Sequence, residues 1–110
     1  MTRTSKSDTE IFAYPNGAPL VRFHPGKTIA AELKARKLTA HRAALMMRVP
    51  PNRLALILAG KRGISADTAL RLARLFGVSA QFWMDLQSKY DLAAAERETG
   101  SRIAAEVEAA

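Results

Sequence analysis

Apolar side chains recur every third or fourth position from residue 25 to about residue 90 of this chain. That spacing is the period of an amphipathic α-helix, and it predicts four or five short helices separated by tight turns. The first predicted helix covers about residues 25–36. It begins at Pro25, because a first helical turn tolerates a residue without an N–H, and its apolar stripe contains Ile29, Ala30 and Leu33.

The second and third predicted helices are separated by a tight turn at residues 48–50. Thr39 is the expected N-cap of the second helix. The inward face of that helix consists of Ala40, Ala43, Ala44 and Met47. The third helix begins at Pro51 and ends before Gly60, which suits a left-handed C-cap. Its expected buried residues are Leu54, Ile57 and Leu58, and its outward residues are Asn52, Ala55, Leu56 and Ala59. The polar N-terminal end of the third helix is therefore expected to face outward.

The fourth predicted helix follows the cap residue Ser65 and ends at Gly77. Its expected inward residues are Ala69, Leu70, Ala73 and Phe76. Asp67 suits the positive end of the helix dipole and is spaced to pair with Arg71. The fifth helix opens at Ser79, and its apolar face contains Phe82, Trp83, Leu86 and Tyr90. That face serves either as ordinary core or, in part, as a dimer surface.

The periodic region has a different kind of sequence on each side of it. Residues 1–21 are rich in Ser, Thr, Pro, Gly and Asn, and we expect a flexible N-terminal arm. The apolar residues of the arm either pack back on the domain or become ordered on a partner. Residues 22–92 form the single predicted domain, as the length of 110 residues allows. Residues 93–110 form an Ala- and Glu-rich tail that is helical or frayed, with an interruption expected at Gly100.

Positive charge is concentrated in one part of the chain. The formal net charge is +7. Residues 22–62 hold ten basic residues against one acid, Glu32, whereas residues 1–21 are neutral and residues 63–110 carry a net −2. A scattered excess would be read as a solubilising surface. Concentration in one segment favours a polyanionic partner, most commonly nucleic acid.

The composition argues against several other classes of protein. With no cysteine there is no disulfide or thiolate metal site, and His24 and His41 lie too far apart to indicate a structural zinc site. No histidine lies near a nucleophile, no glycine loop follows an apolar strand, and the basic half has no paired carboxylates, so we expect neither an enzyme nor a cofactor. The longest apolar run, residues 54–59, is too short to cross a bilayer. We expect a soluble cytoplasmic protein that is located at the nucleoid when bound to DNA.

The second and third helices together match the requirements of a helix-turn-helix. The second of the two helices must be short and supported from behind, because it enters a DNA major groove about 12 Å wide. Its first residues must also expose donors to base edges. These requirements predict double-stranded DNA as the partner.

Four motifs in order give the chain a specific resemblance: "HPGK" at residues 24–27, then "PPNR", "GKRGISADTALRLAR" and "FWMDLQSKYDL" within residues 38–93. With these motifs the chain resembles the HigA family of antitoxins, members of the larger phage-repressor (XRE-type) helix-turn-helix group. The resemblance implies an all-α, five-helix, lambda-repressor-like fold and a homodimer. It further implies binding to a palindromic operator of its own operon, and pairing with a HigB-type toxin that cleaves messenger RNA on the ribosome.

The same resemblance implies the DNA-contacting residues. Positions facing the groove are Ala40, Pro51, Asn52, Ala55 and Leu56, and positions meeting phosphates are Thr39, Lys61 and Arg62. Many relatives have Gln at the first two positions and Gly in the turn where this chain has Arg48. Asn52 is then the one neutral polar base reader, with adenine as its natural partner, and Leu56 is placed to contact a thymine methyl.

Four cations, Arg42, Arg53, Lys61 and Arg62, are expected on one edge, either as phosphate ligands or as a solvated rim. Specificity would then depend on Arg53, on DNA shape and on half-site spacing. Two other functions remain open. The first alternative is a stand-alone repressor without a toxin. The second is an interaction protein whose helix-turn-helix no longer binds DNA.

Overall fold

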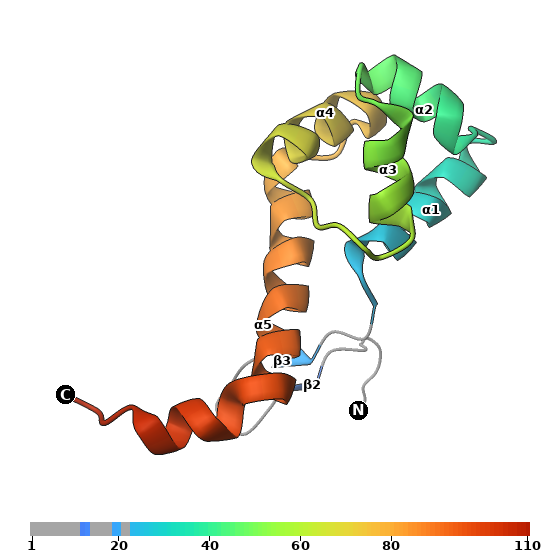
Figure 1. The fold of residues 1–110 in the computed structure, drawn as a ribbon. Coiled ribbons are helices and arrows are strands. Elements are labelled where there is room, and N and C mark those ends of the chain that lie inside the picture. The colour runs from blue at the N-terminus through green and yellow to red at the C-terminus, as the bar shows by residue number, and fades with distance from the viewer. Residues whose placement is uncertain (1–11, 14–18, 21–22) are drawn as a thin grey trace, which may run out of the picture. The chain divides into compact units, whose positions relative to one another are not determined.

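The computed structural model describes residues 12–13, 19–20 and 23–110, and the described part contains five helices (Figure 1). The helices are α1 (Pro25–Ala35), α2 (Ala40–Met47), α3 (Pro51–Leu58), α4 (Ala66–Phe76) and α5 (Ala80–Glu106). The predicted all-α, five-helix fold is confirmed. None of the described helices is long and apolar enough to span a membrane.

Among the described residues, two very short strands precede the helices. β2 (Phe12–Ala13) and β3 (Pro19–Leu20) pair antiparallel, with Phe12 opposite Leu20 and Ala13 opposite Pro19. These four residues belong to the segment predicted as a flexible arm. The rest of residues 1–21 lies outside the described residues, so the arm remains a prediction.

The chain divides into two compact units. One is Phe23–Gln87, which contains α1 to α4 and the first part of α5. The other contains β2, β3 and Ser88–Ala110. Within the first unit α3 packs against α1 and α2, and α4 packs against α2. The first unit therefore holds both helices of the predicted helix-turn-helix and their supports.

Four of the five described helices begin with a side-chain cap. The capping residues are His24 for α1, Thr39 for α2, Ser65 for α4 and Ser79 for α5. The last three were predicted from sequence and are confirmed. In α1, Nδ1 of His24 accepts a hydrogen bond of 3.0 Å from the backbone N–H of Gly26. α3 differs, since it follows Pro50 without any side-chain hydrogen bond at its first turn.

The core of the first unit is formed by one face of each helix. Its fully buried large side chains include Ile29, Leu54, Ile57, Leu72 and Trp83. Trp83 packs edge-on against Phe82, with ring centroids 5.1 Å apart. Because Trp83 is wholly buried and Phe82 is 40 % exposed, the first is ordinary core and the second reaches the surface.

The prediction for the inward face of α4 was wrong at Leu70, which is 62 % exposed, while Leu72 is fully buried in its place. The buried stripe includes the polar residue Thr68, which the apolar pattern left out. Thr68 can be buried because its hydroxyl oxygen accepts a hydrogen bond of 3.2 Å from the hydroxyl of Ser65. Including Thr68 rotates the inward face away from Leu70. In α1, Ala30 is likewise exposed.

The C-terminal tail is helical up to Glu106. The expected interruption at Gly100 is wrong, because α5 runs through it without a break. Alanine and glutamate on both sides have high helix propensity, and a single interior glycine costs only about 1 kcal/mol. Local propensity therefore outweighs the cost of Gly100.

Candidate nucleic-acid interface

The turn between α2 and α3 depends on an unusual backbone conformation at Arg48. Its φ of 59° and ψ of 43° are left-handed, and its N–H bonds to the carbonyls of Ala44 and Leu45. A side chain in this region costs about 1–3 kcal/mol, which is why a glycine suits the position. The turn is held because the next residue, Val49, is buried and the two residues after it are the prolines Pro50 and Pro51. The direction in which α3 leaves the turn is thereby defined.

α3 is supported from behind by the core. Leu54 and Ile57 are buried, with 1 % and 0 % of their surface exposed. The first turn of α1 approaches so closely that a Cβ at Gly26 would collide with the carbonyl oxygen of Ile57. Gly26 is therefore required by packing, a role that the sequence pattern did not reveal. On the opposite side Asn52 and Ala55 are exposed.

The first turn of α3 carries no side-chain cap. The N–H of Arg53 bonds to the carbonyl of Pro50, 3.0 Å away, and the two prolines contribute no N–H. The positive end of the helix dipole is consequently not neutralised by a capping side chain. Such an end attracts anions, and beside it lies the exposed side chain of Asn52.

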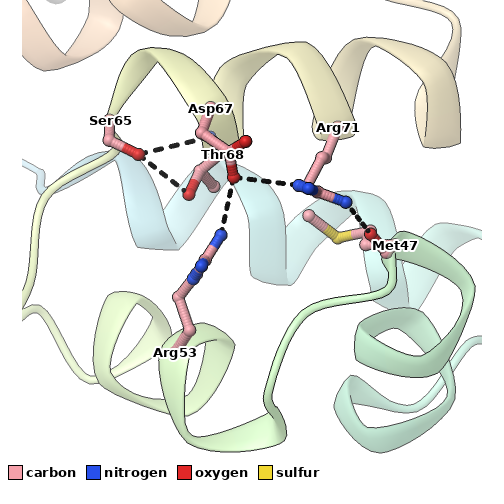
Figure 2. Close-up of polar contacts among 6 residues, drawn as sticks. All are labelled: Met47, Arg53, Ser65, Asp67, Thr68 and Arg71. Carbon is pink, nitrogen blue, oxygen red and sulfur yellow. Dashed lines mark hydrogen bonds and ion pairs between the residues drawn. The ribbon is translucent and has the colours of Figure 1, made fainter.

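Arg53, the third residue of α3, does not extend freely into solvent. Its Nη1 lies 2.8 Å from Oδ2 of Asp67, in the first turn of α4, and only 26 % of its side chain is exposed. The same Oδ2 accepts a hydrogen bond of 2.9 Å from Nε of Arg71. Nη1 of Arg71 in turn donates to the carbonyl of Met47, 2.9 Å away, at the end of α2. Figure 2 shows these contacts, which we call the Asp67 bridge.

The Asp67 bridge ties both helices of the helix-turn-helix to α4. It joins the first turn of α3 to the last carbonyl of α2 through one carboxylate and one guanidinium. Two hydrogen bonds, the one from Arg71 with the larger effect and the one from Arg53 with the smaller, hold the pKa of Asp67 below its usual range. The carboxylate is therefore ionised at neutral pH, and it neutralises part of the charge that the two arginines carry.

The loop after α3 carries two of the predicted phosphate ligands, Lys61 and Arg62, both exposed. It begins at Gly60, whose φ of 76° confirms the predicted left-handed position. Further along, the N–H of Ile64 donates a buried hydrogen bond of 2.7 Å to Oε1 of Gln87. The loop is thus anchored to α5 close behind its two cations.

The ten predicted DNA-contacting residues fall in three places. Thr39, Ala40 and Arg42 lie at the start of α2, residues Pro51, Asn52, Arg53, Ala55 and Leu56 lie on α3, and Lys61 and Arg62 lie in the following loop. Ala40 and Leu56 are half-buried. Within the part of the chain that the structure describes, no carboxylate pairs with Arg42, Lys61 or Arg62. Arg53 differs from these three cations because Asp67 holds it.

Sequence reasoning missed the contact between Asp67 and Arg53, although it foresaw the pair Asp67–Arg71, which is confirmed at 2.9 Å. One signal was present. Asp67 is the first acidic residue after Glu32, so it is the carboxylate nearest along the chain to Arg53, the basic residue of α3.

A second basic residue of the cationic segment is also used structurally. Nη2 of Arg36 donates to the carbonyl of Phe76 at the end of α4, 3.1 Å away, and the guanidinium lies 5.0 Å from the centroid of the Phe76 ring. A cation suits the negative end of the α4 dipole. Among the described residues no group of three or more His, Cys, Asp or Glu is arranged to hold a metal ion.

Comparison with known proteins identifies similar sequences and structures. A helix-turn-helix family model matches residues 29–83. Virulence-associated protein I of Dichelobacter nodosus is 47 % identical over 79 residues, which cover 71 % of this chain and 73 % of that protein. An addiction module antidote protein of the HigA family from Coxiella burnetii is 43 % identical with a TM-score of 0.77, covering 80 % of this chain and 97 % of that one. The Pseudomonas aeruginosa antitoxin HigA, solved with the higBA promoter, is 41 % identical with a TM-score of 0.76, covering 78 % and 95 %.

Proposed function

Because this chain belongs to the helix-turn-helix family, we propose that it is the antitoxin of a type II toxin–antitoxin module. As a homodimer it binds operator DNA and represses its own operon, and it binds and neutralises a HigB-type, mRNA-cleaving toxin. The observation that carries the DNA-binding half is the geometry of α3. Leu54 and Ile57 on the inner face of this helix are buried in the core, while its uncapped first turn and Asn52 are exposed.

The proposed DNA contacts follow from exposure and charge. Asn52 hydrogen-bonds a base edge, with adenine as the favoured partner, and Leu56 contacts a thymine methyl. The exposed cations Arg42, Lys61 and Arg62 bind phosphates, together with Thr39. The remaining groove-facing positions, Ala40, Pro51 and Ala55, supply close apolar contact without reading a base. Direct readout is therefore thin, and DNA shape contributes to the choice of operator.

A salt titration tests the DNA-binding half. The affinity of the full-length protein for a duplex from upstream of its own gene should fall by about 10³-fold between about 50 and 200 mM salt if about six phosphates are met. Fluorescence anisotropy at several salt concentrations measures this slope. A flat salt response, or no binding at low salt, would leave the chain as an interaction protein that does not bind DNA.

The toxin-binding half rests on similarity to the two HigA antitoxins. It is tested by co-expressing the chain with the product of the small reading frame adjacent to its gene. The expected result is a complex that co-purifies by size exclusion and relieves the growth arrest caused by that product alone. If no adjacent product arrests growth or forms a complex, the chain is a stand-alone repressor.

A further inference from the structure

Asp67 lies close to the proposed DNA-contacting residues and has a charge opposite to theirs. Its side chain is 56 % exposed, and its Oδ2 accepts from Arg53 at 2.8 Å and from Arg71 at 2.9 Å. A carboxylate near a phosphate backbone repels it, so electrostatics alone would disfavour an acid here. Affinity for DNA therefore does not explain an acidic residue at this position.

The first reason is mechanical. Arg53 immediately follows Asn52, and it is held at its far end by a carboxylate of α4. Arg71 extends the same contact to the carbonyl of Met47, where α2 ends. Rotation or sliding of α3 against α2 would break at least one of these hydrogen bonds. The Asp67 bridge thus restrains the angle at which the first turn of α3 is presented.

The second reason is electrostatic. A free arginine at the third position of α3 would bind any phosphate within reach whatever the base sequence, and so strengthen binding to DNA that is not the operator. Paired with Asp67, Arg53 has its charge offset and its reach limited, with 26 % of its side chain exposed. By contrast, Arg42, Lys61 and Arg62 have no carboxylate partner among the described residues.

We propose, on the premise of the DNA-binding function above, that Asp67 is a specificity-determining positioning residue. Acting through Arg53 and Arg71, it holds α3 in register and keeps Arg53 from serving as an indiscriminate phosphate ligand. The operator is preferred over other sequences partly because this one acid lowers binding to the others.

Asp67→Asn separates charge from shape, because the amide oxygen can occupy the place of Oδ2 while the negative charge is lost. Binding to a scrambled duplex of the same length and composition should tighten about threefold to tenfold at low salt. The slope of log affinity against log salt on that duplex should become steeper by about 0.9, the value of one added phosphate contact. The ratio of operator to scrambled affinity should fall by a similar factor, because on the operator the gain from the freed Arg53 is offset by weaker base contacts once α3 is no longer held in register.

Three controls accompany this measurement. Asp85→Asn makes the same change in net charge at an exposed α5 residue whose Oδ1 accepts from Gln81, and it should leave the slope and the ratio unchanged. Asp67→Glu keeps the charge and should retain most of the preference for the operator. In the background of Arg53→Met, Asp67→Asn should lose most of its effect on the slope, because the freed cation is absent.

The outcomes separate the two proposals. If the unmodified protein shows no salt-dependent binding to its upstream duplex, the DNA-binding function fails. If it binds, and Asp67→Asn weakens both duplexes equally with an unchanged slope, Asp67 is a purely structural residue and this inference is wrong. The inference also fails if Asp67→Asn and Asp85→Asn behave alike. Circular dichroism shows whether Asp67→Asn is folded at the assay temperature. If it is unfolded, the comparison of Asp67→Glu with the unmodified protein decides instead. Because Asp67→Glu retains the charge, a shifted salt slope in that variant would overturn the inference.

Discussion

The first turns of α3 and α4 lie close enough to share an ion pair, yet the two helices begin in opposite ways. α4 opens with the hydroxyl of Ser65 accepting from the N–H of Thr68, and Asp67 adds a negative charge at the positive end of the dipole. α3 opens with two prolines and no side-chain cap. The α4 end is capped within the protein, whereas the α3 end has no capping side chain.

The outer faces of the two helices differ in the same way. α3 exposes small and amide side chains, Ala55 and Asn52, which let another molecule approach the backbone closely. α4 exposes Leu70 and the charged pair Asp67–Arg71. The comparison teaches that packing behind α3 and contacts made by α4 leave the front of α3 available. Four predictions test it.

The largest expected effect concerns burial. Leu54→Ala removes a side chain of α3 that is 1 % exposed, and the free energy of unfolding should fall by about 2–5 kcal/mol. Leu70→Ala, the matched change on α4, removes a side chain that is 62 % exposed and should cost less than about 0.5 kcal/mol. Urea unfolding followed by circular dichroism measures both. Equal losses would contradict the assignment of inner and outer faces.

A change at the front of α3 should affect DNA binding and leave folding intact. Asn52→Ala is expected to cost about 1–3 kcal/mol of binding to the operator and to relax preference at one base pair, because one bidentate contact is lost. Arg62→Ala should instead weaken binding to all sequences alike. Binding to a panel of single-base-pair operator variants distinguishes the two, and identical profiles would show that Asn52 is not the reader.

A change at the start of α4 should do the reverse. Ser65→Ala deletes the cap of α4, and the free energy of unfolding should drop by about 1 kcal/mol. Operator affinity, measured well below the melting temperature, should stay the same. Thermal melts and anisotropy titrations on one preparation test this. A loss of affinity without a loss of stability would mean that the two helix ends are not used differently.

The smallest expected effect is the pH dependence of the Asp67 bridge. The hydrogen bonds from Arg71 and Arg53 lower the pKa of Asp67 in the folded protein, so the bridge stabilises the fold above the ordinary aspartate pKa of about 3.9 and loses this contribution as the pH falls below it. The difference in unfolding free energy between the unmodified protein and Asp67→Asn should therefore be constant near neutral pH and shrink below about pH 4. A difference that grows on acidification has the wrong sign.

Much of the fold was predictable because its signals are local. Thr39, Ser65 and Ser79 bond to backbone N–H groups three residues away, so their types and positions alone predicted the helix starts. The left-handed conformation of Gly60 was predicted correctly, and Arg48 was placed in the turn, although its own left-handed conformation was not predicted. Leu70 was misplaced because Thr68 is buried through a hydrogen bond that apolar periodicity does not count.

The candidate site was predictable in outline and less so in detail. Exposure of Asn52 and Ala55 follows from the same helical period that buries Leu54 and Ile57. The pairing of Arg53 with Asp67 spans fourteen positions and joins two helices, so it depends on how α3 and α4 pack. The requirement for glycine at residue 26 arises in the same way, from the approach of α1 to the carbonyl of Ile57.

The amino-acid sequence by itself determined where the helices begin, where the first four of them end, which segment is cationic and which helix presents a polar front, because period, capping and charge act over a few neighbouring residues. Only the tertiary structure decided which face of α4 is buried and which arginine is paired with a carboxylate. Those outcomes depend on side chains that meet across helices, and such contacts exist only once the chain has packed.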